Sequence, residues 1–372
     1  MIRRFLSTIL LLALAAAAPS ASAADKSAAD GAKVLNLYIW SDYLAPDTLK
    51  NFTKKTGIKV NMSVFDSSEA LEAKLLAGGS GYDVIVPNGP VLKRLIQAGA
   101  VQRLDKSKLP HIATQDADIV GRAAVADPGN AHGIVYMWGT SGIGYNVAKV
   151  KKALGPNAPV DSWKLILDPA NAEKLSKCGL YAFDSAADIF ELTLNYVGKD
   201  PHSANPKDYE DAAAVWQKVR PSITKFHNSE YISALANGDV CVAMGFSGDV
   251  FQARDRAKEA KKGVEIAYSI PKEGAVIWFD FMAIPKDAPH TDAAYAFLDY
   301  ILTPDVIGNI TNSMGYANAN TKAGPFTDKE ILKDENVYPG KAVMSHLFPE
   351  SNPSPEIERL RTRIWNRVKS GT

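Results

Sequence analysis

Apolar and polar positions alternate along the chain, from residue 34 onward, in a way that predicts strands and helices in turn. Short apolar runs predict strands, and apolar residues three or four positions apart predict helices. The predicted strands are residues 34–40, 58–65 and 83–87; the predicted helices are residues 46–52, a segment capped by Ser67 or Ser68 that carries Leu71, Leu75 and Leu76, and residues 91–98. Strands that alternate with helices favour an α/β fold with a parallel sheet covered on both faces.

The ends of these predicted strands are candidate ligand sites. In parallel α/β sheets, ligands bind beyond the carboxyl ends of the strands, often at helix N-termini. That rule selects three segments of this chain, residues 40–43, 66–68 and 88–90.

The middle of the chain predicts a connection between two lobes. Residues 139–146 (GTSGIGYN) are rich in glycine but lack the G-x-G-x-x-G pattern, so a crossing strand is favoured over a nucleotide-binding loop. A second alternating region covers residues 161–248, residues 271–288 resemble two strands joined by a turn, and residues 355–368 predict a basic amphipathic helix. Roughly 350 residues exceed what one compact core usually serves, so two lobes are expected.

The first residues have the order of a secretory signal peptide. Arg3 and Arg4 precede an apolar run over residues 5–18, and residues 21–23 (ASA) supply a cleavage site. We therefore expect a signal peptide over residues 1–23, on the general secretory route rather than the twin-arginine route. The apolar run is too short to span a bilayer, and no cysteine near the cleavage site offers a lipid anchor. The sequence predicts a protein exported to the periplasm.

Charge and cysteine content narrow the possible partners. The chain has 42 basic and 41 acidic residues, which excludes the basic footprint of a nucleic-acid-binding protein. The two cysteines, Cys178 and Cys241, fit no zinc or redox motif. In an oxidising compartment one disulfide between them is expected, with two buried thiols as the alternative.

Motifs for catalysis are absent from the sequence. The six histidines are scattered, and no pair has the spacing of an H-E-x-x-H metal site. The segment from Gly245 to Asp249 resembles a nucleophile elbow, but the G-x-S-x-G pattern fails at Asp249. No flavin or nicotinamide fingerprint is present, so we expect no cofactor, no metal and a binding protein rather than an enzyme.

Several short segments pair an aromatic residue with a carboxylate. Such a pairing suits an organic polyamine, because buried ammonium groups need carboxylates and a methylene stem packs on flat aromatic rings. Each segment alone is more simply explained by packing, but together they favour a binding site. The segments are Trp40-Ser41-Asp42-Tyr43, Phe246-Ser247-Gly248-Asp249, Trp278-Phe279-Asp280 and the segment containing Tyr316.

The same segments resemble a known family. Residues 37–49 (LYIWSDYLAPDTL) are similar to the opening segment of periplasmic putrescine-binding proteins. Further similar segments follow in the same order, at residues 82–87, 138–146, 194–201, 236–239, 270–274 and 316–320. The resemblance covers the chain from about Val34 to its C-terminus, and a match in seven ordered segments is specific.

The resemblance implies a type II, two-lobed binding protein with discontinuous lobes and a polyamine in the cleft. It implies an N-terminal lobe of residues 32–138 plus 265–312 and a C-terminal lobe of residues 139–264 plus 313–372, with the hinge near residues 138–142, 263–265 and 315. The implied ligand-binding residues are Trp40, Ser41, Asp42, Tyr43, Asn88, Asp188, Phe246, Asp249, Trp278, Asp280 and Tyr316. Among them, Asp42, Asp249 and Asp280 are expected to bind ammonium groups, while Trp40, Phe246, Trp278 and Tyr316 enclose the methylenes.

Four positions depart from the putrescine-binding pattern. Asn88 stands where the resemblance leads us to expect Ser, and Phe246 stands in place of Trp. Trp278 stands in place of Phe, as in spermidine-preferring relatives, and Asp188 stands in place of Glu. These changes leave the choice between a diamine and a triamine open.

The resemblance thus implies a monomeric periplasmic protein that delivers putrescine or spermidine to the permease of an ABC importer. Two alternatives use the same pocket. One is a binder of another cationic solute, such as agmatine, cadaverine or a basic amino acid. The other is a sensor that presents a polyamine to a membrane receptor.

Overall fold

The computed structural model describes residues 33–65 and 67–371. The predicted signal peptide (residues 1–23) and Asp66 lie outside these residues. Within the described part of the chain, no helix combines the length and the apolar character needed to cross a bilayer.

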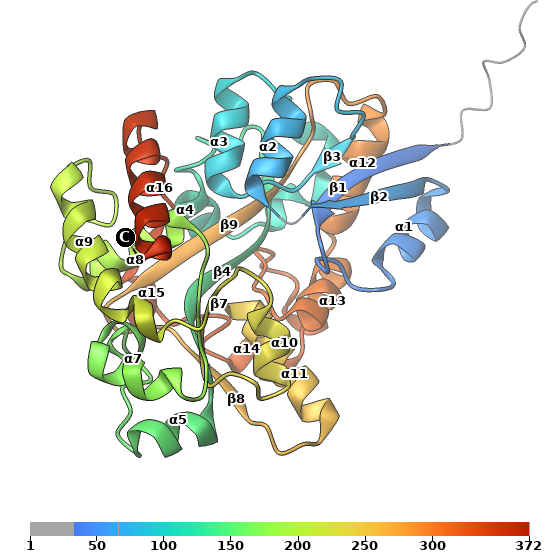
Figure 1. Cartoon of the computed structure of the whole chain (residues 1–372). Helices are drawn as coiled ribbons and strands as arrows, with labels where there is room; N and C mark the ends of the chain where they lie inside the picture. The colour runs from blue at the N-terminus through green and yellow to red at the C-terminus, as the bar shows by residue number, and fades with distance from the viewer. Residues whose placement is uncertain (1–32, 66, 372) are drawn as a thin grey trace, which may run out of the picture. The chain divides into compact units, whose positions relative to one another are not determined.

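A mixed sheet organises the described residues (Figure 1). The order of its strands is β2-β1-β3-β9-β4-β7-β5-β6, with β10 beside β9 and β8 beside β4. The strands are β1 (Val34–Trp40), β2 (Lys59–Phe65), β3 (Val84–Ile85), β4 (Gly133–Asn146), β5 (Leu180–Ala182), β6 (Lys225–Phe226), β7 (Val242–Phe246), β8 (Ile266–Ser269), β9 (Ala275–Ala283) and β10 (Leu347–Pro349).

Helices surround both ends of this sheet. A first group of helices, from the early and later parts of the chain, consists of α1 (Thr48–Thr56), α2 (Ser68–Leu76), α3 (Gly89–Gln97), α4 (Ala117–Ala123), α12 (Thr291–Ile301) and α13 (Pro304–Met314). Of these, α3 contacts β9, as does α8 from the next group. The others are α5 (Val147–Leu154), α6 (Lys164–Leu167), α7 (Pro169–Ser176), α8 (Ala186–Tyr196), α9 (Pro206–Val219), α10 (Tyr231–Ala236), α11 (Ser247–Ala260), α14 (Lys329–Lys333), α15 (Lys341–Met344) and α16 (Pro355–Ser370). Single 3₁₀ turns occur at Lys106–Lys108, Pro110–Thr114, Arg220–Ser222 and Gly324–Phe326.

Local sequence signals set the bounds of the first helices. Ser67 accepts a hydrogen bond from the Ala70 amide and caps α2, and Asn88 caps α3 in the same way through the Val91 amide. Gly57 ends α1 in the left-handed conformation, with φ 74°, which costs glycine little. The strands and helices predicted for residues 34–98 are therefore confirmed as β1 to α3.

Strand β4 connects the two halves of the sheet. Its fourteen residues pair with β9 from Gly133 to Thr140 and with β7 from Ser141 to Tyr145. We call β1, β2, β3, β9 and β10 the first half of the sheet, and β5, β6, β7 and β8 the second half. Figure 1 shows β4 running beside β9, the strand of the first half with which it pairs. The lobe boundaries given above stay predictions.

Two details differ from the sequence-based expectation. The sheet is mixed: β1 is parallel to β2 and β3, β5 to β6 and β7, and β9 to β10, while β4 is antiparallel to β7, β8 and β9. Residues 271–288 form one strand, β9, rather than a pair, because the turn falls before it at Lys272 and Glu273. Every residue of β9 is buried, so the sequence lacks the two-residue period that marks a half-exposed strand.

The two cysteines form a disulfide, as predicted. Cys178 follows α7 and Cys241 precedes β7, with Cα atoms 5.5 Å apart and a sequence separation of 63. The bond ties α7 to the second half of the sheet. Its effect on stability comes mainly from restricting the unfolded chain, and that effect grows with the length of the closed loop.

We expect the double variant Cys178→Ala/Cys241→Ala to lose about 2–4 kcal/mol of unfolding free energy, the loss typical of a loop this long. Urea unfolding followed by circular dichroism measures the loss. A reductant should destabilise the wild-type protein to the same degree and leave the double variant unaffected. Equal unfolding midpoints for the oxidised and reduced wild type would contradict the prediction.

Candidate functional site

Asp280 is a buried carboxylate in the first half of the sheet. Trp278 and Asp280 are two residues apart on β9, so their side chains project from the same face. The Tyr43 hydroxyl donates a hydrogen bond of 2.7 Å to Asp280 Oδ2, and Asp280 is only 8% exposed. Burial raises the pKa of Asp280 to about 7, while the hydrogen bond from Tyr43 acts in the opposite direction.

Tyr43 is held in place by neighbouring aromatic residues. It follows a turn after β1 in which Asp42 takes a left-handed conformation with φ 52°. Its ring packs edge-on against Tyr136 and Tyr316, with centroids 5.3 and 5.7 Å away, and the Tyr136 hydroxyl donates to the Tyr43 carbonyl at 2.6 Å. Burial, with the charge of Asp280, raises the pKa of Tyr43 well above its usual value, so its hydroxyl stays a donor.

Asp249 is the corresponding carboxylate beside the second half of the sheet. It lies in the first turn of α11, directly after β7. Two tyrosine hydroxyls donate to it, Tyr316 to Oδ1 at 2.6 Å and Tyr231 to Oδ2 at 2.7 Å. Burial raises the pKa of Asp249, the two hydrogen bonds lower it, and the nearby charge of Asp42 raises it again.

A series of aromatic contacts connects these two carboxylates. Trp278 packs edge-on against Tyr316 at 5.1 Å and against Phe246 at 6.0 Å, and Phe246 stacks on Phe183 at 4.7 Å. Two glycines make room for the rings. A Cβ at Gly139 would lie 2.5 Å from the Trp278 ring, and a Cβ at Gly248 would lie 2.5 Å from the Tyr316 ring. A side chain at either glycine would therefore displace a ring.

The remaining residues predicted near the end of β1 are more exposed. Trp40 is half-buried and packs on Phe65 with centroids 4.4 Å apart, while Ser41 and Asp42 are exposed. The indole nitrogens of Trp40 and Trp278 are buried and have no hydrogen-bond partner within the described part of the chain. Polar atoms of this kind are costly unless another molecule bonds to them.

Asn88 and Asp188 lie at helix N-termini, and Asn88 is also next to Asp280. Asn88 caps α3, forms an isolated β-bridge with Asp280, and donates from Nδ2 to Glu350 Oε1 at 3.4 Å. Asp188 lies in the first turn of α8, where Ser185 is the cap. Burial raises the pKa of Asp188, opposed by its contact with Ser185 and by the charge of Arg361.

Sequence analysis missed several residues of this site. Tyr136 and Tyr231 carry no local signal, because their partners lie 93 and 18 residues away. Glu350 does carry a local signal, because it directly follows the short strand β10. Residues just beyond the carboxyl end of a strand are candidate ligand sites in such sheets. Glu350 joins Asp188 and Glu191 as a third acid near Asp280.

The chemistry of this arrangement is suited to a cationic ligand. Asp188, Asp249, Asp280 and Glu350 form no salt bridge with a Lys, Arg or His in residues 33–65 and 67–371. Among the same residues, no group of three or more His, Cys, Asp or Glu side chains is arranged to hold a metal ion. Ser247, at the failed nucleophile motif, contacts the Thr140 amide at 3.4 Å. The site offers carboxylates held by tyrosine hydroxyls beside aromatic rings.

Comparisons with known proteins agree with this geometry. The family model described as bacterial extracellular solute-binding protein matches residues 47–339. The chain is 49% identical over 372 residues to the putrescine-binding periplasmic protein SpuD of Pseudomonas aeruginosa, covering all of both chains. It is also 49% identical over 370 residues to the putrescine-binding periplasmic protein PotF of Escherichia coli, covering 99% and 98% of the two chains.

A solved structure shows the same fold. The spermidine/putrescine ABC transporter substrate-binding protein PotD of Streptococcus pneumoniae superposes with a TM-score of 0.78 at 28% identity, over 91% of this chain and 99% of that one. The two-lobed type II fold predicted from the sequence is therefore confirmed. The chain belongs to the bacterial extracellular solute-binding protein family.

Proposed function

We propose that this protein binds a polyamine between its two lobes in the periplasm and delivers it, chemically unchanged, to the permease of an ABC importer. Support comes from the relatives named putrescine-binding periplasmic proteins and from the structural neighbour named as a substrate-binding protein of an ABC transporter. The expected signal peptide fits the same compartment.

One observation carries the proposal. Two carboxylates, Asp249 and Asp280, face a shared set of aromatic rings from different halves of the sheet, and each is oriented by tyrosine hydroxyls. A flexible polyamine has charged ends and an apolar middle, and this arrangement provides a partner for each part. Ammonium groups pair with the carboxylates, and the methylenes pack on Trp278, Phe246 and Tyr316.

Ligand binding in this arrangement favours the closed form. A polyamine that contacts Asp280 and Asp249 together binds more tightly when the two lobes meet, and this difference in affinity shifts the population toward closure. Exclusion of water then strengthens each carboxylate–ammonium interaction, because the local dielectric constant falls. The permease is proposed to recognise the closed form.

Replacing either carboxylate by its amide should weaken polyamine binding strongly. Asn retains the shape of Asp and an oxygen that accepts from the tyrosines, so the lost charge dominates. We expect Asp249→Asn and Asp280→Asn each to raise the Kd by about 30-fold or more, since removing one partner of a buried charge pair costs about 2–5 kcal/mol. Isothermal titration calorimetry with putrescine and spermidine, on protein refolded to remove retained ligand, measures the change.

The matched control is Asp292→Asn, whose carboxylate is 95% exposed on α12. It should bind like the wild type. A Kd within threefold of the wild-type value for Asp280→Asn would remove Asp280 from the proposed site. Titrations with agmatine, cadaverine and lysine test the other cationic solutes. If one of them binds more tightly than putrescine and spermidine, it becomes the proposed ligand in their place.

Polyamine affinity should rise with pH between about 5.5 and 8. The pKa of Asp280 is about 7 in the ligand-free protein, so below pH 7 binding must first remove a proton from this carboxyl group. Amine groups of the ligand stay charged over this range, because the pKa of an alkyl ammonium is about 10. At the acidic end of this range, affinity should fall by about tenfold for each pH unit.

Other titrating groups around Asp280 define the control for this measurement. Tyr43, Tyr136 and Tyr316 stay neutral over the range because burial raises the pKa of each well above its usual value, while Glu350 is a second carboxyl whose pKa is raised. Calorimetry across the pH range should therefore show a shallower slope for Asp280→Asn than for the wild type. Identical slopes for the two proteins would contradict the assignment to Asp280.

A further inference from the structure

The two faces of strand β4 differ at the point where it crosses between the halves of the sheet. A Cβ at Gly139 would meet the Trp278 ring, so Gly139 faces the candidate site. Successive residues of a strand project from opposite faces, so its neighbour Trp138 faces away from that site. The register agrees, because Trp138 lies opposite Phe279, which stands between Trp278 and Asp280 on β9. Strand β4 therefore separates the candidate site from a second region on its other face.

A cavity of about 760 Å³ occupies this second region, and we call it the back cavity. Trp138 contributes to its lining, together with residues of two walls. The first wall is α4 with the residue before it, Asp116, and the second wall is the segment that runs from Tyr338 to Ser345. Asn318 and its neighbours complete the lining, in a chain segment that forms an isolated β-bridge with Trp138.

The two walls of the back cavity are attached to different halves of the sheet. Gln115, just before the first wall, donates from its side chain to the carbonyl of Val135, in the part of β4 that pairs with β9. The second wall follows Asp334, which pairs with Arg254 on α11 at 3.3 Å, and α11 packs on β7 and β8. A rotation of one half against the other therefore changes the width of the back cavity.

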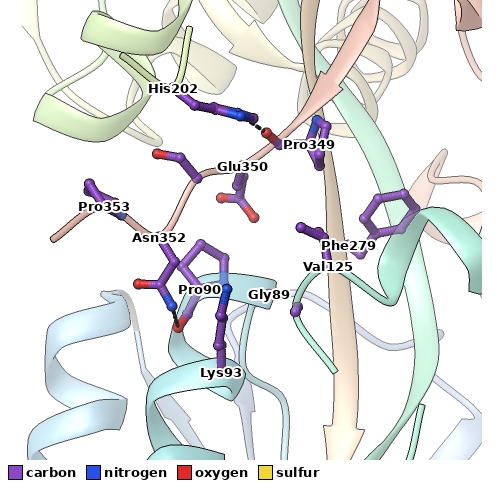
Figure 2. Close-up of a pocket in the computed structure, with 12 residues that line it drawn as sticks. Gly89, Pro90, Lys93, Val125, His202, Phe279, Pro349, Glu350, Asn352 and Pro353 are labelled. Atoms are coloured by element: carbon purple, nitrogen blue, oxygen red, sulfur yellow. Dashed lines mark hydrogen bonds between the residues drawn. The ribbon is translucent and has the colours of Figure 1, made fainter. Parts of the chain in front are cut away.

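Segments attached to both halves also meet beside the candidate site. Figure 2 shows Asn352, which precedes α16, donating from Nδ2 to the carbonyl of Pro90 on α3, at 3.5 Å. Asn88 donates to Glu350 at 3.4 Å, and a cavity of about 170 Å³ lies between Pro90, Glu350 and Asn352. Helix α16 packs on α8 and α9, whereas α3 packs on α2. The structure is therefore closed on this side, while the back cavity is wide.

We propose that the residues lining the back cavity set the polyamine affinity without contacting the ligand, through the balance between the open and closed forms. This inference rests on the proposed function. The candidate site and the back cavity lie on opposite faces of the same crossing strand, so a rotation that opens the site brings the walls of the back cavity together. Side chains that fill the back cavity therefore disfavour the open form.

The effect on affinity follows from the population of the closed form. A ligand that binds only the closed form has an apparent Kd equal to its intrinsic Kd divided by the closed fraction of the ligand-free protein. Any rise in that fraction lowers the apparent Kd. Because the closed fraction belongs to the ligand-free protein, the Kd changes by the same factor for every ligand of the site.

The variant Ser345→Trp fills the back cavity from its second wall. Ser345 is exposed, and its hydroxyl donates only to the Ala342 carbonyl, three residues earlier, at 2.7 Å. The Kd values for putrescine and spermidine should both fall by the same factor, about 3- to 10-fold, as measured by calorimetry on refolded protein. Ser345→Ala removes the same hydroxyl without adding volume and should leave both Kd values unchanged.

Two further variants separate the filled volume from local effects. Lys341→Trp adds a ring from the start of α15 on the same wall and should also lower both Kd values, whereas Lys341→Gln removes the same charge without filling the cavity. The matched control is Ser370→Trp at the end of α16. The Ser370 hydroxyl also donates to a carbonyl three residues earlier, that of Arg367, and this variant should bind like the wild type.

Small-angle X-ray scattering gives a readout that altered ligand contacts would not change. The ligand-free Ser345→Trp protein should have a smaller radius of gyration than the ligand-free wild type, because more of it is closed. Saturation with putrescine should bring the two proteins to the same radius of gyration. Thermal unfolding of each variant confirms that folded proteins are compared, and Lys341→Trp serves as the filled variant if Ser345→Trp does not fold.

The outcomes separate this inference from the proposed function. Unchanged or higher Kd values in the folded Trp variants at Ser345 and Lys341 would overturn the role of the back cavity and leave the proposed function intact. A change in Kd that differs between putrescine and spermidine would do the same, because it would indicate an altered ligand contact. A wild-type protein that binds neither ligand would overturn the proposed function itself.

Discussion

The antiparallel pairing of β4 with β9 is the constraint on which the rest of the structure depends. This pairing fixes the face of β9 from which Trp278 and Asp280 project. Beyond β9, β4 pairs with β7, the strand that precedes Asp249. The two carboxylates thus belong to different halves of the sheet but share one central strand. Because both faces of β9 are covered, Asp280 lies where an unpaired charge is costly to bury.

Tyrosine hydroxyls offset part of that cost without neutralising the acids. A lysine or arginine beside Asp249 or Asp280 would stabilise the ligand-free protein and compete with a cationic ligand. A tyrosine donates one hydrogen bond, keeps the carboxylate oriented and leaves its charge available. In the proposed role of these carboxylates, stability of the free protein is exchanged for affinity, as in binding sites that are built in advance.

Local sequence signals predicted much of the fold but only part of the site. The first strands and helices follow from apolar spacing and from caps such as Ser67, Asn88 and Gly57, which act within a few residues. Strand β9 was misjudged because a strand buried on both faces has no alternation to detect. The aromatic–acid segments identified Asp249 and Asp280, whose binding roles stay predictions. Tyr231 was missed because its contact with Asp249 arises only in the folded chain. Glu350 was missed although it follows a strand, because β10 is only three residues long and gives a weak pattern.

Gly139 and Gly248, which pack against the aromatic rings, limit which positions of this site can change. Gly139 and Gly248 each meet a ring of the site at a distance that excludes a side chain, so the aromatic wall tolerates little change without rearrangement. The segment after β10 is different: residue 350 leaves the ladder, and its side chain reaches a cavity rather than a packed ring. A substitution at residue 350 can therefore change what lines this cavity without displacing the rings that pack against Gly139 and Gly248.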